Sequence, residues 1–246
     1  MAAGKRRLDQ LLVERGLAES RSKAQALILA GLVFADELRL DKAGMELPVD
    51  AAVTVRGAEH PWVGRGGVKL AHALAHFAID PTGRTCLDVG ASTGGFTDVL
   101  LTRGAARVYA VDVGHGQLAW KLRRDARVVV LERTNARALG PKLVPEPIDL
   151  IVADVSFISL TVALPAALSL GRRGAVLVAL VKPQFDVGKG QVGKGGIVRD
   201  PGLHEAACAR VRAFLVEAGW TVRGIIPSPI TGADGNQEFL IVADLA

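Results

Sequence analysis

A short apolar segment that runs directly into a glycine-rich turn is the strongest constraint on the fold of this chain. The segment covers residues 85–89 and continues as Asp88-Val-Gly-Ala-Ser-Thr-Gly-Gly-Phe-Thr97, after which a helical pattern begins. Glycine has no Cβ, so the backbone of such a turn can approach a ligand closely, and the following helix offers unpaired N–H groups there. The stretch therefore predicts a strand, a ligand-binding turn and a helix.

A second strand end indicates which ligand to expect. Residues 107–112 form another apolar segment that closes on Asp112, where a carboxylate can accept hydrogen bonds from both hydroxyls of a ribose. The glycine spacing, Gly90-x-x-x-Gly94-Gly95, lacks the G-x-G-x-x-G of dinucleotide-binding proteins. A turn that merely packs a strand on a helix remains the alternative, but we expect S-adenosylmethionine rather than NAD. Its candidate binding residues are Asp88, Gly90, Ala91, Ser92, Gly94, Phe96, Asp112, Asn135 and Asp154.

The rest of the chain after residue 68 alternates strand-like and helix-like segments. Strands are expected at 85–89, 107–113, 127–131, 149–155, 175–181, 221–227 and 239–244, with helices between them, notably at 97–101, 117–123, 160–168 and 203–218. Their near-continuous Val, Ile, Leu and Ala content is typical of a sheet covered on both faces. The last two are joined by a short segment rich in Pro and Gly, which favours an antiparallel final pair. We therefore predict a Rossmann-like, doubly wound α/β sheet with its last strand antiparallel.

The first 59 residues are predicted to form a small α/β module of their own. One amphipathic helix ends at Gly16, and Ser20 is placed to cap a second helix over 21–30, with short strands after it. A linker at 60–67 contains Pro61 and three glycines, and the larger domain covers 68–246. Six of the module's nine basic residues lie in its first 23 positions, against three acidic ones. Such a cluster can face phosphates, or it can be an ordinary solvated helix face.

Composition excludes several classes of protein. Only Cys86 and Cys208 occur, in no pair or metal-ligand spacing, which predicts buried thiols in a reducing compartment. The chain begins without an apolar leader, and its longest apolar region, 160–181, is interrupted before reaching the ~20 residues of a membrane span. We therefore expect a cytoplasmic protein with no membrane segment and no metal. The net charge of +5 is compatible with a phosphate-bearing partner, although solubility alone explains such a value.

Charged residues at the ends of the apolar strands are the candidates for chemistry. Asp154 and Lys182 follow wholly apolar segments, where an unpaired buried charge would be costly. Each could also be a simple salt-bridged charge at a strand end. Glu238 precedes the last strand and can return to the same edge of the sheet. The glycine-rich run 188–196, with Lys189 and Lys194, is either a loop that closes over a substrate backbone or a plain connection.

Two sets of motifs resemble known families. Arg7-Leu-Asp-Gln-Leu-Leu-Val-Glu-Arg-Gly16, Ser20-Arg-Ser-Lys-Ala24 and Ile28-Leu-Ala-Gly-Leu-Val33 resemble the S4 RNA-binding domain. Lys69, Asp154, Lys182 and Glu238 match in order and context the K-D-K-E tetrad of the FtsJ-like 2′-O-ribose methyltransferases. With both sets present, the chain from about residue 5 to 246 resembles the TlyA family, also called hemolysin A.

The resemblance implies an enzyme that uses S-adenosylmethionine to methylate the ribose 2′-hydroxyl of cytidines in ribosomal RNA, 23S first and 16S as a further candidate. Lys182 would act as the base or steer the hydroxyl electrostatically. Asp154 and Glu238 would supply the orienting hydrogen bonds, and Lys69 would act as a nearby like charge. Ribosomal RNA or a ribosomal subunit is the expected partner of a protein that is monomeric without RNA. Candidate RNA-binding residues are Arg6, Arg7, Arg21, Lys23, Arg65, Lys189 and Lys194.

Three other functions remain open from the residues alone. A methyltransferase for a small molecule or a base nitrogen would not need the first sixty residues or two lysines. A membrane-lytic protein would need an amphipathic or spanning apolar segment. A non-catalytic ribosome-binding factor would not need an intact glycine turn, Asp112 and tetrad.

Overall fold

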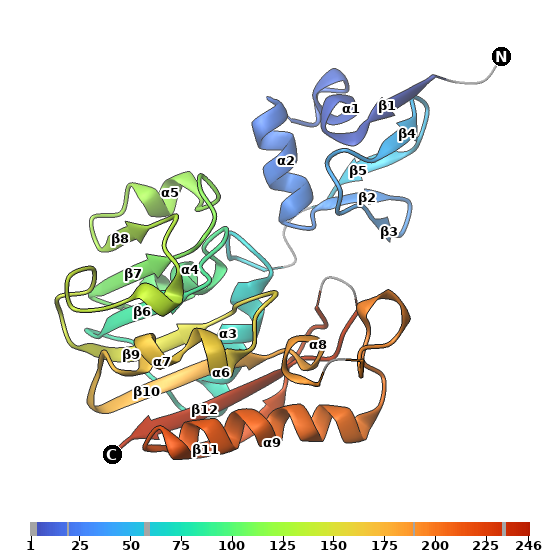
Figure 1. The fold of residues 1–246 in the computed structure, drawn as a ribbon. Coiled ribbons are helices and arrows are strands. Elements are labelled where there is room, and N and C mark those ends of the chain that lie inside the picture. Colours follow the sequence, from blue (N-terminus) through green and yellow to red (C-terminus); the bar gives the residue numbers. More distant parts are fainter. Residues whose placement is uncertain (1–3, 19, 57–59, 189, 233–234) are drawn as a thin grey trace. The chain divides into compact units, whose positions relative to one another are not determined.

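The computed structural model describes residues 4–18, 20–56, 60–188, 190–232 and 235–246. The chain divides into two compact units, Met1–Arg65 and Gly66–Ala246. Each is described by itself below, with the element labels of Figure 1.

The N-terminal unit contains two helices and two small antiparallel sheets. Its elements are β1 (Lys5–Arg7), α1 (Leu8–Glu14), α2 (Arg21–Leu29), β2 (Val33–Ala35), β3 (Leu38–Arg39), β4 (Glu46–Pro48) and β5 (Val53–Val55). Strand β1 pairs with β4, and β2 lies between β3 and β5. The pair β1–β4 was not foreseen, because Lys-Arg-Arg has no strand signature and all three residues are exposed. Only the pairing with β4 makes this segment a strand.

Helix–helix packing explains why this unit is compact at its size. Leu8 and Leu12 of α1 pack with Ile28 of α2 in one buried cluster that also includes Val33 and Val53 of the strands. The Ser20 hydroxyl accepts a hydrogen bond from the Lys23 N–H at 3.2 Å, which confirms the predicted helix cap.

The C-terminal unit is built on a seven-stranded sheet of order β11-β12-β10-β9-β6-β7-β8. Strand β12 pairs antiparallel with both of its neighbours, as predicted, and the other pairs are parallel. The strands are β6 (Thr85–Val89), β7 (Arg107–Val111), β8 (Val128–Leu131), β9 (Ile148–Ala153), β10 (Gly171–Val181), β11 (Trp220–Pro227) and β12 (Phe239–Leu245).

Helices cover both faces of this sheet (Figure 1). One face carries α3 (Gly66–His76) and α4 (Gly95–Thr102), which contact each other. On the other face α6 (Leu160–Ala163), α7 (Pro165–Leu168) and α9 (Pro201–Glu217) complete a large apolar core. The remaining elements are α5 (Trp120–Arg123), α8 (Pro183–Asp186) and the 3₁₀ helices Ala136–Ala138 and Lys194–Gly196. The doubly wound α/β prediction is confirmed.

Local details differ from the predictions for identifiable reasons. The helix expected over 160–168 is divided into α6 and α7 at Pro165, which has no N–H to continue the hydrogen-bond ladder. The helix expected from residue 117 begins only at Trp120, because residues 113–119 form a loop. Gly66 and Gly67, expected in the linker, are the first residues of α3.

Candidate active site

The register of the sheet brings the candidate catalytic residues to one edge. Val89 of β6 and Ala179 of β10 both pair with Ala153 of β9, and Val181 of β10 pairs with Phe239 of β12. The carboxyl edge of a doubly wound sheet, where the strand order reverses, is the usual position of its ligand. The residues that stand next along the chain at this edge are Gly90, Asp154, Lys182 and Glu238.

A cavity of about 500 Å³ opens at this edge, between the ends of β6, β7 and β9. Five of the predicted cofactor residues line it: Gly90, Ser92, Asp112, Asn135 and Asp154. The lining also contains Val113, Gly114, Gln117, Thr134, Ser156, Phe157 and Ile158, which are not among the predicted cofactor residues. They directly follow predicted strand ends, so the signal was present, but a strand end does not reveal how its loop turns.

The Asp112 carboxylate is fixed by main-chain donors. Its Oδ2 accepts a hydrogen bond from the Ser92 N–H at 2.8 Å, and its Oδ1 accepts one from the Gly114 N–H at 2.7 Å. Ser92 has a φ of 49°, in the left-handed region that non-glycine residues rarely adopt. The glycine turn therefore folds back onto the end of β7 and orients this carboxylate at the cavity.

Glycine is required in the turn by close packing. Gly90 has a φ of 86°, and a Cβ there would lie 2.6 Å from the Asp154 carbonyl oxygen. Only a residue without a side chain allows the ends of β6 and β9 to approach this closely. The turn thus forms the wall of the cavity beside Asp154.

Four predicted cofactor residues lie outside the cavity lining: Asp88, Ala91, Gly94 and Phe96. All four are shielded by the turn, and Asp88 is completely buried. The Thr97 hydroxyl donates a 2.6 Å hydrogen bond to Asp88 Oδ2, while Oδ1 has no hydrogen-bond partner among the described residues. Burial raises the pKa of Asp88 to about 7.

Lys182, the first residue beyond β10, contacts two side chains of the loop after β9. Its Nζ lies 2.7 Å from Asp154 Oδ1 and donates a hydrogen bond to Ser156 Oγ, also at 2.7 Å. The Lys182 side chain is 9% exposed and that of Asp154 20%. The amine is thus nearly enclosed but remains beside the cavity that Asp154 and Ser156 line.

Lys69 of α3 and Glu238 form a second, deeper pair. Lys69 Nζ donates to Glu238 Oε2 at 2.5 Å, and both side chains are almost fully buried. A Cβ on Gly66, one helical turn before Lys69, would lie 3.6 Å from Asp154 Oδ2. The amino end of α3 therefore approaches Asp154, and the two lysine–carboxylate pairs lie at the same edge of the sheet.

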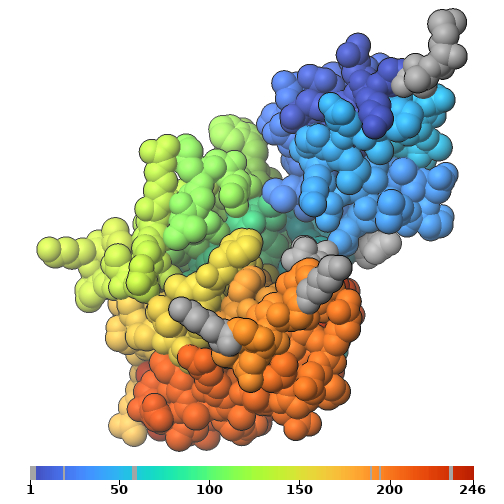
Figure 2. All heavy atoms as spheres, turned by 45° about the vertical axis from the view of Figure 1, so that its right-hand side comes forward, coloured from blue at the N-terminus to red at the C-terminus, as the bar shows by residue number. Residues whose placement is uncertain are grey.

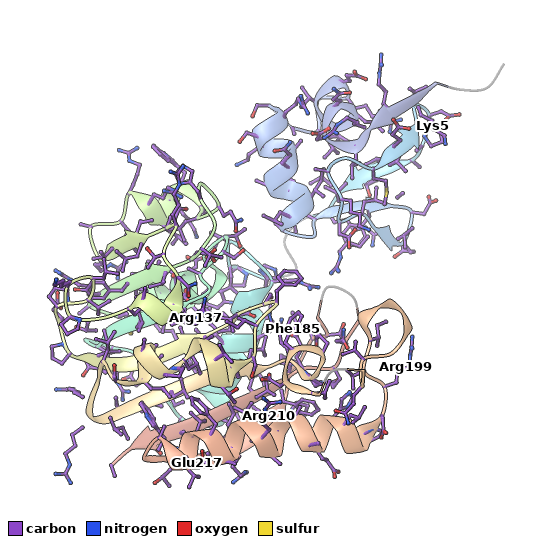
Figure 3. The ribbon with its side chains drawn as sticks, in the orientation of Figure 1. Lys5, Arg137, Phe185, Arg199, Arg210 and Glu217 are labelled. Atoms are coloured by element: carbon purple, nitrogen blue, oxygen red, sulfur yellow. The ribbon has the colours of Figure 1, made fainter. Side chains whose placement is uncertain are left out.

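Asp186 connects the two loops that carry Lys182 and Ser156. Its buried Oδ1 accepts hydrogen bonds from the Ser159 hydroxyl at 2.6 Å and from the Leu160 N–H at 3.2 Å. Arg210 of α9, labelled in Figure 3, donates to the Asp186 carbonyl oxygen at 3.3 Å. Figure 2 shows the yellow and orange segments that follow β9 and β10 side by side on one face of this unit.

An exposed aromatic residue adjoins the lysine. Phe157 is 91% exposed with a φ of 65°, and its ring centroid lies 5.5 Å from that of Phe185, which is labelled in Figure 3. A strained backbone that exposes a large apolar ring is uncommon outside functional sites.

The predicted RNA-binding residues of the N-terminal unit are mostly engaged with acids. Arg7 and Arg21 both donate to Asp9, whose carboxylate is completely buried. Arg6 pairs with Glu14 at 3.4 Å, whereas Lys23 is exposed. Arg65 closes this unit and is partly buried. Lys189 and the side chain of Lys194 lie outside the described residues.

Both cysteines are buried, and burial raises the pKa of the Cys86 thiol to about 12 and that of Cys208 to about 11.

Within the described ranges, no three His, Cys, Asp or Glu side chains form a group suited to a metal ion. No helix of the described chain is long and apolar enough to cross a membrane.

Sheet order, covering helices and the cavity at the reversal point define a Rossmann-like methyltransferase fold. The family model of FtsJ-like methyltransferases matches residues 62–245, and the S4 domain model matches residues 6–53. The chain belongs to the TlyA, or hemolysin A, family of FtsJ-like methyltransferases that carry an S4 domain.

Similar proteins span the whole chain. It is 53% identical to the 16S/23S rRNA (cytidine-2′-O)-methyltransferase TlyA of Mycobacterium tuberculosis, over 97% of this chain and 90% of that protein. Identity to the putative rRNA methyltransferase YqxC of Bacillus subtilis is 50%, over 98% and 86%. The solved structure of a putative hemolysin from Streptococcus thermophilus is similar with a TM-score of 0.77 at 43% identity, covering 100% of this chain and 90% of that one.

Proposed function

We propose that this protein transfers a methyl group from S-adenosylmethionine to the ribose 2′-hydroxyl of cytidines in ribosomal RNA, in 23S and in 16S. The observation that carries the proposal is the pair of lysine–carboxylate contacts at the carboxyl edge of the sheet, with Asp154 of one pair in the lining of the cavity. The relative named as a 16S/23S rRNA (cytidine-2′-O)-methyltransferase supports the substrate. Its site of action would be the cytoplasm, where ribosomal subunits occur.

The cavity residues fit the proposed cofactor. Asp112 offers a carboxylate with both oxygens oriented by main-chain N–H groups, as ribose hydroxyls require. Gly90 removes the side chain that would fill the wall, and Asn135 adds a polar group to the lining. Asp88, Ala91, Gly94 and Phe96 would support this wall from beneath. S-adenosylmethionine supplies a methyl group on a positively charged sulfur, so the reaction needs no metal ion.

We assign Lys182 as the base that accepts the proton of the ribose hydroxyl. A ribose hydroxyl is a very weak acid, so a base must take its proton as the oxygen forms the new bond to carbon. The proton passes to the Nζ lone pair of a neutral Lys182, and its electron pair stays on the oxygen. That oxygen would form the ether bond to the methyl carbon as the carbon–sulfur bond breaks with its electrons to sulfur, which would leave as a neutral thioether. Asp154 positions Lys182, and the Lys69–Glu238 pair completes the polar floor of the site.

The N-terminal unit would bind the RNA. We propose the division 1–59 for the RNA-binding domain, 60–67 for the linker and 68–246 for the methyltransferase domain, in a protein that is monomeric without RNA. Arg6, Arg7, Arg21, Lys23 and Arg65, together with Lys189 and Lys194, would contact phosphates. A sequence-independent phosphate contact positions the RNA rather than selecting the base.

The test measures transfer of a tritiated methyl group to ribosomal subunits from a bacterium that lacks this modification, followed by nucleoside analysis for 2′-O-methylcytidine. The wild-type protein should produce it, and Lys182→Ala should reduce the rate by at least roughly a hundredfold, the usual range for loss of a general base. Cofactor affinity should change no more than about threefold, because Lys182 is not among the residues that line the cavity.

Lys142→Ala is the matched control, since Lys142 is an exposed lysine of the same unit. Methylation on a base instead of a ribose, or full activity of Lys182→Ala, would refute the proposal.

A further inference from the structure

Ser156 is a side chain of the site that lies outside the lysine–carboxylate tetrad. It stands two residues after Asp154, is exposed, lines the cavity and accepts a 2.7 Å hydrogen bond from Lys182 Nζ. Asp154 Oδ1 lies at the same distance from that nitrogen. The lysine amine therefore donates one hydrogen bond, to Ser156 Oγ, and forms an ion pair with Asp154 Oδ1, and both partners come from the loop that follows β9.

These two contacts restrict the orientation of the Lys182 amine. A neutral lysine nitrogen is tetrahedral, with one position taken by Cε, two by hydrogens and one by the lone pair that accepts a proton. When one hydrogen is held by the hydrogen bond to Ser156 Oγ and the amine also faces the Asp154 carboxylate, the lone pair has a single preferred direction. With only the Asp154 contact, the amine can rotate about the Cε–Nζ bond and the lone pair changes direction.

We propose that the Ser156 hydroxyl is a positioning residue that sets the direction of the Lys182 lone pair toward the ribose hydroxyl. The inference rests on the proposed function of Lys182 as the base. The transferred proton moves from the ribose oxygen to Nζ, and Ser156 neither gains nor loses a proton in the step.

The surrounding structure supports this role. Asp186 ends helix α8, which Lys182 precedes directly, and it accepts a hydrogen bond from Ser159, which follows Ser156 in the same loop. The hydroxyl and the amine are therefore attached to one hydrogen-bonded frame, and their relative position does not depend on the exposed loop surface alone. Preorganised partners of this kind contribute to catalysis by keeping the reacting groups aligned.

The experiment compares Ser156→Ala, Ser156→Thr and the control Ser169→Ala on ribosomal subunits, with kcat, KM and cofactor affinity measured separately. Ser169 is an exposed serine whose hydroxyl bonds only to the Ala166 carbonyl among the described residues. We expect kcat of Ser156→Ala to fall roughly 10- to 100-fold, part of the effect of a general base. KM should stay within about twofold, and because Ser156 lines the cavity, the loss of cofactor affinity should be smaller than the loss of kcat.

Ser156→Thr keeps the hydroxyl, and the exposed position has room for its methyl group, so it should retain most of the wild-type kcat. Equal losses for Ala and Thr, a kcat of Ser156→Ala within about twofold of wild type, or a loss confined to KM or cofactor affinity would each overturn the inference. Lys182→Ala distinguishes the two levels of the argument. If it is inactive while Ser156→Ala is unaffected, only the role of Ser156 fails; if it remains active, the assigned base fails as well.

Discussion

The two units of this protein each contain a completely buried aspartate, and the two carboxylates are in opposite situations. Asp9 in the N-terminal unit accepts hydrogen bonds from Arg7, Arg21 and Gln25. Asp88 in the C-terminal unit accepts one from the Thr97 hydroxyl. The arginine contacts, that of Arg7 above all, lower the pKa of Asp9, whereas burial raises that of Asp88 to about 7.

The charged side chains of the two units are also arranged differently. In the N-terminal unit the buried acid orders arginines that remain about half exposed, at 43% for Arg7 and 54% for Arg21. In the C-terminal unit two lysine–carboxylate pairs are nearly enclosed at the carboxyl edge of the sheet. Partly exposed arginines spread over a surface can contact several phosphates of an RNA. Enclosed lysine–carboxylate pairs are better placed to act on a single reacting atom.

The largest effect is expected from breaking the buried pair of the C-terminal unit. Lys69→Met leaves Glu238 buried without its partner and should lower the free energy of unfolding by about 3–5 kcal/mol. The exposed replacement Lys142→Met should be nearly neutral. Thermal unfolding monitored by circular dichroism measures both.

The double replacement Lys69→Met with Glu238→Met separates stability from chemistry. Removing both charges should restore most of the lost stability, because no unpaired charge remains buried, and methyl transfer should stay low. A double variant as active as wild type would show that this pair serves only the fold.

The pH dependence of stability should differ between the two buried aspartates. Asp88 has a folded pKa of about 7 against an ordinary value of 3.8, so its stabilising contribution is full below pH 3.8 and is lost as the pH rises through 7. Asp88→Asn stays neutral. Its free energy of unfolding should therefore rise relative to that of the wild type by about 1.4 kcal/mol for each pH unit between pH 3.8 and 7. The lowered pKa of Asp9 has the opposite sign: its contribution is present above pH 3.8 and is lost as the pH falls.

Asp9→Asn should therefore destabilise the N-terminal unit at pH 7, by roughly 2 kcal/mol for lost charge-assisted hydrogen bonds, and the gap should close below pH 4. Amide hydrogen exchange between about pH 2 and pH 8 measures the stability of the two units separately. Parallel pH curves for wild type and Asp88→Asn would contradict the comparison.

The smallest effect is expected at the exposed surface of the N-terminal unit. Lys23→Ala removes one exposed ammonium from α2 and should weaken RNA binding roughly threefold while lowering the slope of log affinity against log salt by about one. Stability should not change measurably. Filter binding to ribosomal RNA at several salt concentrations measures the slope, with Lys142→Ala as control; identical slopes would remove Lys23 from the interface.

Much of the larger unit could be predicted because its signals are local. Apolar runs show where the strands lie, and the residue after each run shows what chemistry the sheet edge presents, as with Asp112 and Lys182. Prediction was weaker where pairing decides the structure. Strand β1 is three charged residues with no strand pattern, and the loop at 113–119 replaced the expected helical turn.

The fold class, the glycine turn and the four tetrad residues could be recognised from the sequence alone, since each is marked by its neighbours in the chain. Only the tertiary structure decided that Lys69 pairs with Glu238, 169 positions away, that Lys182 contacts both Asp154 and Ser156, and that Asp88 is enclosed beneath the turn. Such contacts depend on strand register and helix packing, which bring residues that are distant in the sequence to hydrogen-bond distance of one another. The protonation of a carboxylate depends in turn on those contacts and on its distance from water.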